Sequence, residues 1–121
     1  MTNADMVQEF HDRFGVDSDK DLESDPKLIE LRLKLIAEEY REVCDAFVTG
    51  TRYDIAKELC DLLYVTYGTL ITFGMNPNRC FAEVHKSNMT KLDKDGKPVY
   101  HENGKVKKSD QYIEADLTDI F

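Results

Sequence analysis

The spacing of apolar and polar positions predicts four helices, over residues 6–14, 26 to about 50, 53–73 and 77 to about 92. Apolar residues recur in these segments at steps of three and four, which is the period of a helix with one buried face. Residues that commonly begin or end helices separate these four segments, and they account for the predicted boundaries. The pattern therefore indicates an all-α fold.

Capping residues support these boundaries. Gly15 follows the first helix as a C-cap, and Gly74 follows the third. Asp25 precedes Pro26 as N-cap and first helical residue of the second helix, and Asn76 precedes the fourth helix in the same way. Gly68, inside the third helix, is expected to let another helix approach closely.

The second predicted helix has the strongest apolar stripe, at alternating steps of four and three. Its members are Ile29, Leu33, Ile36, Tyr40, Val43 and Phe47. Such a stripe is typical of a helix that packs against other helices. The three cysteines, Cys44, Cys60 and Cys80, also lie in apolar contexts and are expected to be reduced core thiols.

The pattern changes after residue 92. Asn103-Gly104 separates two short extended segments, 98–101 and 105–107, and this is a strong hairpin signal. An irregular tail follows, which Tyr112, Ile113, Leu117 and Phe121 are expected to anchor. We expect one domain over 1–121, with a helical body over about 4–92 and a hairpin arm and tail over 93–121.

The net charge of −8 is spread unevenly along the chain. Residues 86–110 contain seven lysines and four acids, whereas residues 1–85 are strongly acidic. An acidic body argues against a broad nucleic-acid-binding face. The lysine-rich segment fits either a solvated tail or an arm that holds a small anion. No apolar run is long enough for a bilayer and no signal peptide is visible, so a cytoplasmic protein without a membrane partner is expected.

Five acids stand out on the second and third predicted helices. Glu38, Glu39 and Glu42 lie on the second, and Glu58 and Asp61 on the third. Side chains three residues apart share a helix face, with Cβ atoms about 5–6 Å apart. A short turn joins the two helices, so they are expected to pack antiparallel and to bring the pairs Glu39–Glu42 and Glu58–Asp61 face to face.

The spacing leaves two interpretations of these acids open. Converging carboxylates repel one another, and a hard divalent cation such as Mg²⁺ would relieve the repulsion. Alternatively, the acids form a salt-bridge network with Lys34, Arg41 or Lys57. A ferritin-type di-iron site is excluded because no histidine lies three residues after a glutamate.

The order "EEYRE", fifteen residues and then "ELCD" resembles the signature of the all-α nucleoside triphosphate pyrophosphohydrolases, the MazG-like superfamily. "DLLYVTYGTLITFGM" and "VHKSNMTKLDKDGKPVYHENGKVKK" are similar to its compact phosphoribosyl-ATP pyrophosphohydrolase-like branch. The resemblance covers about residues 6–117. It implies a four-helix MazG-like fold whose core is shared in a homodimer or a dimer of dimers.

The resemblance also implies a site. Two or more Mg²⁺ ions, which Mn²⁺ could replace, would be held by Glu39, Glu42, Glu58 and Asp61. Glu38 would position or deprotonate the attacking water, and Asn88, Lys91, Lys105 and Lys108 would bind substrate. The family cleaves a nucleoside triphosphate between its α and β phosphates, which yields the monophosphate and pyrophosphate.

Three functions follow as alternatives. The first is cleavage of dUTP or another non-standard or surplus deoxynucleotide. The second is phosphoribosyl-ATP hydrolysis, and the third is a catalytically silent helical dimer that binds nucleotide or metal. The base-binding residues stay open, because Phe10, Phe14 and Tyr67 could stack on a base or pack in the core.

Overall fold

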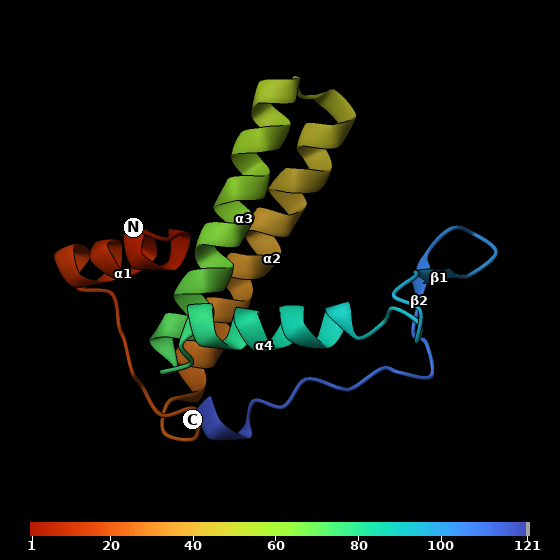
Figure 1. Ribbon diagram of the computed structural model, residues 1–121. Helices are drawn as coiled ribbons and strands as arrows, with labels where there is room; N and C mark the ends of the chain where they lie inside the picture. The colour runs from red at the N-terminus through yellow and green to blue at the C-terminus, as the bar shows by residue number, and fades with distance from the viewer. Residues whose placement is uncertain (121) are drawn as a thin grey trace. The chain divides into compact units, whose positions relative to one another are not determined.

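The computed structural model describes residues 1–120 and is mainly helical (Figure 1). Its elements are α1 (Asn3–Phe14), α2 (Pro26–Thr49), α3 (Arg52–Thr72), α4 (Pro77–Met89), β1 (Val99–Tyr100), β2 (Val106–Lys107) and the 3₁₀ turn η1 (Thr118–Ile120). The expected all-α class, with four helices followed by a small hairpin, is confirmed. Phe121, expected to anchor the tail, lies outside the described residues.

The chain forms two compact units, the first from Met1 to Pro77 and the second from Asn78 onward. The first unit contains α1, α2 and α3, and α4 is grouped with the hairpin. The organisation as one domain with a body over 4–92 stays a prediction. Among the described residues, no helix combines the length and the apolar character that a membrane span requires.

Local side-chain hydrogen bonds explain where the helices of the first unit begin. Asp25 Oδ1 accepts from the Leu28 amide at 3.1 Å, as its predicted role as N-cap requires. Thr2 and Asp5 form a capping box that starts α1 three residues earlier than the apolar pattern indicated. A second capping box, between Thr51 and Asp54, starts α3 directly after the α2–α3 turn.

In the first unit α2 and α3 lie side by side, and α1 packs across α3 (Figure 1). The small apolar core includes Val7, Leu28, Val43 and Ile71. Gly68 has the predicted role of allowing a close approach. A Cβ atom there would lie 2.6 Å from Arg32 Nη2 and 3.0 Å from His11 Nε2, and both side chains are buried.

Much of the apolar stripe on α2 is not buried within one chain. Val43 is buried, but Leu33, Tyr40 and Phe47 are each about 60% exposed. The cysteine prediction also holds only in part, because Cys80 is buried whereas Cys44 and Cys60 are exposed. A surface of this kind is unusual for a monomer.

In the second unit, β1 and β2 pair antiparallel around the predicted Asn-Gly turn, with Val99 opposite Lys107. Tyr112 and Leu117 are half-buried, as expected of residues that anchor the tail, but Ile113 is not. The Ile113 side chain is 68% exposed and anchors nothing by burial. Instead, Ser87 Oγ donates to the Ile113 carbonyl at 2.7 Å, and the Ile113 amide donates to Thr90 Oγ1 at 2.8 Å.

Candidate metal and substrate site

Three of the predicted acids meet between α2 and α3. Glu39 comes from α2, and Glu58 and Asp61 come from adjacent turns of α3. Each offers a carboxylate oxygen, and these oxygens all lie within 4.8 Å of one another. All three residues are half-buried. The i, i+3 spacing on α3 and the pairing with α2 thus bring together three of the four acids that the sequence predicted to meet.

Like charges at this distance disturb the titration of Glu39. Burial raises the pKa of its carboxyl, and the charges of Asp61, Glu58 and Glu42 raise it further. Both effects act against the ionised form. The cluster is therefore electrostatically unfavourable unless a cation neutralises it.

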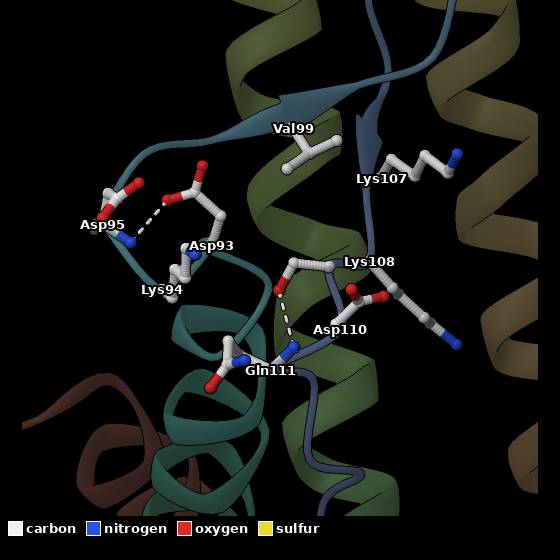
Figure 2. A pocket seen from close by; sticks show the side chains of 9 residues that line it. Asp93, Lys94, Asp95, Val99, Lys107, Lys108, Asp110 and Gln111 are labelled. Carbon is white, nitrogen blue, oxygen red and sulfur yellow. Dashed lines mark hydrogen bonds between the residues drawn. The ribbon is translucent and has the colours of Figure 1, made fainter.

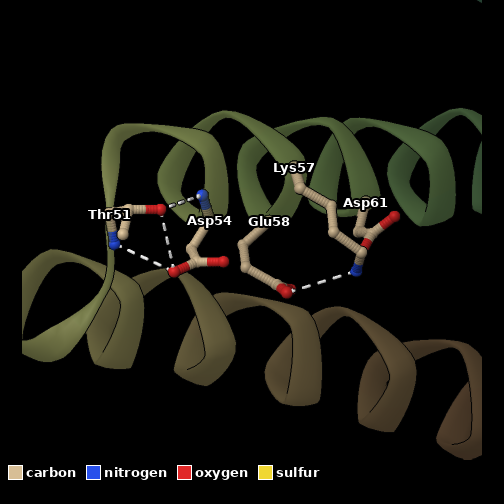
Figure 3. A network of polar contacts seen from close by, with 5 residues as sticks. All are labelled: Thr51, Asp54, Lys57, Glu58 and Asp61. Atoms are coloured by element: carbon tan, nitrogen blue, oxygen red, sulfur yellow. Dashed lines mark hydrogen bonds and ion pairs between the residues drawn. The ribbon is translucent and has the colours of Figure 1, made fainter.

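One such cation is Lys57, on α3 (Figure 3). Its ammonium donates to Asp61 Oδ2 at 2.8 Å and to Glu58 Oε1 at 3.3 Å, and these bonds raise the pKa of Lys57. The side chain is about half exposed, so it can swing into water. The salt-bridge interpretation is thus present in the structure, on two of the three acids that a metal would use.

Glu42 is exposed and lies outside this group of three. It lines an adjoining acidic cavity of about 230 Å³, together with Asp45, Asp54 and Glu58. Sequence reasoning missed Asp45 and Asp54, although each is three or four residues from a predicted ligand. Asp54 has a structural role as well, because Thr51 donates to its carboxylate from both the amide and the hydroxyl (Figure 3).

Glu38, the predicted water-activating residue, precedes Glu39 on α2 and is half-buried. Neighbouring residues on a helix point about 100° apart. Glu38 is consequently not a member of the three-carboxylate group. Its role in holding the attacking water stays a prediction.

The predicted substrate-binding residues all lie in the second unit. Asn88 is exposed in the last turn of α4, and the Lys91 amide donates to its carbonyl at 3.1 Å. Lys105 lies in the hairpin turn, where its amide donates to Asn103 Oδ1. Lys108 lies after β2, with its ammonium 4.6 Å from the centre of the Tyr112 ring.

A cavity of about 370 Å³ accompanies this lysine-rich region (Figure 2). Lys94, Lys107 and Lys108 contribute to its lining, as do Asp93, Asp95 and Asp110. The Asp93 carboxylate is already engaged, because it accepts from the amides of residues 95 and 97 at 2.9 Å. The lining thus carries three lysines and three acids, and the lysines supply the positive charges that could contact an added anion.

The comparisons with known proteins agree with this description. The phosphoribosyl-ATP pyrophosphohydrolase family matches over residues 7–88, and the chain belongs to that family. It is thereby a member of the MazG-like all-α pyrophosphohydrolases, a class that hydrolyses acid anhydrides. The chain is also similar to uncharacterized protein L479 of Acanthamoeba polyphaga mimivirus, with 34% identity over 113 residues. That alignment covers 89% of this chain and 43% of the viral protein, so the chain spans less than half of its relative's length.

Proposed function

We propose that this protein is a Mg²⁺-dependent nucleoside triphosphate pyrophosphohydrolase that cleaves between the α and β phosphates. One observation carries the proposal: Glu39, Glu58 and Asp61 converge within 4.8 Å in a chain of the phosphoribosyl-ATP pyrophosphohydrolase family. The products are a nucleoside monophosphate and pyrophosphate. We place the reaction in the cytoplasm.

The chemistry of the three acids fits a hard divalent cation. All three metal-ligand atoms would be carboxylate oxygens, which Mg²⁺ and Mn²⁺ prefer over nitrogen and sulfur ligands. Burial and the neighbouring charges of Asp61, Glu58 and Glu42 raise the pKa of Glu39, and an added cation would oppose this rise. Glu39, Glu58 and Asp61 would hold one ion, and Glu42 with Glu58 would contribute to a second. When bound, such ions polarise phosphoryl oxygens and stabilise charge on the leaving phosphate.

The chain's own residues have separate tasks in this proposal. Glu38 orients the attacking water and accepts its proton. A metal ion held by Glu58 and Asp61 would displace the ammonium of Lys57, which could then face solvent or substrate. Asn88, Lys91, Lys105 and Lys108 bind the substrate, and the lysines act as mobile positive charges for its phosphates.

Two substrates are candidates. We favour dUTP or another non-standard or surplus deoxynucleotide, which would make the protein a house-cleaning enzyme. Phosphoribosyl-ATP is the second candidate, because the matching family carries that activity in its name. A silent nucleotide-binding helical protein is the remaining alternative, and the same experiment separates all three.

The test is a panel of canonical and non-canonical nucleoside triphosphates with phosphoribosyl-ATP, incubated with Mg²⁺ or Mn²⁺. We expect release of pyrophosphate from at least one deoxynucleotide. Release of single phosphates would contradict α–β cleavage, and binding without turnover would favour the silent alternative. Glu38→Gln should abolish turnover and keep substrate binding, whereas full activity of that variant would remove its proposed role.

We also propose that the active unit is a homodimer or a dimer of dimers. The exposed side chains of Leu33, Tyr40 and Phe47 recur every seven residues on α2 and would form its interface. Light scattering of Tyr40→Glu against the wild type tests this assembly. The wild type should have the mass of a dimer or larger assembly, and the variant should dissociate. If wild type and variant both have the mass of a monomer, the proposal is rejected.

A further inference from the structure

A second cavity of the first unit lies between α1 and α3. It measures about 150 Å³ and is lined mainly by apolar groups. Its lining includes Asn3, Met6 and Val7 from α1, and Leu63, Tyr64 and Tyr67 from α3. Two tyrosine rings and an amide are therefore available at one small, otherwise apolar site.

One lining residue of this cavity, Tyr64, lies one helical turn from Asp61 of the acidic cluster. Tyr64 follows Asp61 by three residues on α3, so the two side chains share a helix face. Their Cα atoms are separated by only about 4.5 Å along the helix axis. A molecule whose phosphates are held at Asp61 therefore has its remaining part within reach of Tyr64.

An aromatic cluster holds Tyr64 in place. The Phe10 ring meets the Tyr64 ring edge-on at 5.7 Å and stacks on the Phe14 ring at 4.4 Å. Such pairs contribute stability beyond burial alone. Phe14 is nevertheless 70% exposed, and Phe10 and Tyr64 are each 39% exposed. The cluster thus lies at the surface and not in the core, and of its three rings Tyr64 lines the cavity.

We propose that this cavity binds the pyrimidine base of the substrate nucleotide. The inference rests on the proposed function and adds the class of base. An apolar cavity of about 150 Å³ accommodates a single six-membered aromatic ring. The bicyclic ring of a purine requires more room. Tyr64 supplies a wall for stacking, and the Asn3 amide and the Tyr67 hydroxyl supply polar groups for the edge of the base.

Nucleosides without phosphate test the pocket separately from hydrolysis. Deoxyuridine, deoxycytidine, thymidine and deoxyadenosine are each added at millimolar concentration in the presence of EDTA. Saturation-transfer NMR then reports which base protons contact the protein. We expect transfer to the pyrimidines and at least fivefold less to deoxyadenosine.

Matched variants assign that contact to the cavity. Met6 is 49% exposed and Leu63 is 50% exposed, so Met6→Phe and Leu63→Phe fill the cavity without entering the core. Each should reduce pyrimidine binding about fivefold or more, in line with the loss of a stacked base. The control is Tyr53→Ala, an exposed tyrosine at the start of α3, which should bind as the wild type does.

Several results would overturn the proposal that this cavity binds a pyrimidine base. They are equal transfer to purine and pyrimidine, absence of transfer to every nucleoside, and unchanged binding by both filling variants. A change in mass of the filling variants on light scattering would instead assign this face to contact between copies. Pyrophosphate release measured in parallel separates the two proposals. Binding of pyrimidines without turnover rejects the proposed pyrophosphohydrolase activity. Equal kcat/KM for purine and pyrimidine triphosphates rejects the proposed pyrimidine-binding cavity.

Discussion

The first unit contains two polar clusters of opposite character. One is the group Glu39, Glu58 and Asp61, and the other surrounds Arg32 and His11. Arg32 is only 7% exposed, and its guanidinium forms hydrogen bonds to other residues of the same chain. Its Nε donates to Thr69 Oγ1 at 3.2 Å and its Nη2 to the Val65 carbonyl at 3.0 Å.

The difference lies in where each cluster finds its partners. The guanidinium of Arg32 meets neutral acceptors from the neighbouring helix, and buried charges need such bonds. The three acids meet one another, and the single lysine that pairs with two of them is half exposed. A cluster whose charged group is hydrogen-bonded by other residues of the chain stabilises the fold. A cluster of acids that lacks enough positive charge is suited to bind a cation from solution.

Asp61→Asn gives the sharpest test of this distinction. Loss of one carboxylate should lower pyrophosphate release about a hundredfold or more, because it weakens the metal's hold and the stabilisation of developing charge. Thermal stability should stay the same or rise, since a repulsive charge is removed. The control is Glu30→Gln, an exposed acid of α2. A variant that loses activity only because it unfolds would show that the acids serve the fold.

Arg32→Met should have the opposite effect. It removes two hydrogen bonds and leaves buried acceptors with fewer donors, so unfolding in urea should become easier by about 2–4 kcal/mol. Arg41→Met, at an exposed position on the same helix, is the control and should change stability little. If Arg32→Met were as stable as the wild type, the cluster around Arg32 would not support the fold.

His11 should make stability depend on pH. Burial lowers the pKa of its imidazole, and the charge of Arg32 adds to this effect. The unfolded chain therefore takes up a proton near the ordinary pKa of 6.5 while the folded chain resists it. Stability should fall as the pH drops below about 6.5.

His11→Gln isolates this effect. Urea midpoints measured from neutral to mildly acidic pH should decline less steeply in the variant than in the wild type. Nδ1 of His11 lies 3.1 Å from the Asp17 carbonyl, which the neutral ring can satisfy as a donor. Parallel curves for the two proteins would show that His11 does not resist protonation in the fold.

Thr72→Val should stabilise the protein slightly. Thr72 is fully buried, and its hydroxyl has no hydrogen-bond partner among the described residues. Replacing it by an apolar group of similar shape should add up to about 1 kcal/mol. Thr69→Val is the matched control and should destabilise, because the Thr69 hydroxyl bonds both Arg32 and the Val65 carbonyl. Equal effects from both variants in thermal melts would contradict the comparison.

Lys57→Ala should have the smallest effect. Its ammonium competes with a metal for Glu58 and Asp61, so calorimetric titration with Mg²⁺ should show affinity increased about two- to fivefold, as is usual for exposed ion pairs. Lys34→Ala, at an exposed position of α2, is the control. Weaker metal binding in Lys57→Ala would mean that Lys57 supports the site instead of competing for it.

Local chemistry made much of this protein predictable. Asp25-Pro26, Gly15 and Asn103-Gly104 act through bonds and torsions of neighbouring residues, so the ends of helices and the hairpin could be read directly. Thr2 was overlooked as a cap because the first helix was predicted to begin only at Met6, whereas the capping box of Thr2 and Asp5 begins it at Asn3. Glu39, Glu58 and Asp61 were predictable since i, i+3 spacing and a short turn constrain where they lie.

The burial of individual side chains was not predictable in the same way. Arg32 is buried because Gly68, far along the chain, leaves room for its guanidinium. Leu33 and Phe47 belong to the strongest apolar stripe and are still exposed, since nothing in the first unit covers them. Periodicity shows that residues share a face, but it does not show what packs against that face.

The amino-acid sequence alone thus determined the helices, their caps, the hairpin and the set of acids, because these depend on spacing and on contacts between near neighbours. Only the tertiary structure decided that Glu42 lies apart from the other three acids and that Lys57 bonds two of them. It also decided that Tyr64 both meets the Phe10 ring and lines a small cavity between α1 and α3. These features depend on how helices cross, and the crossing is set by the packing of side chains from distant parts of the chain.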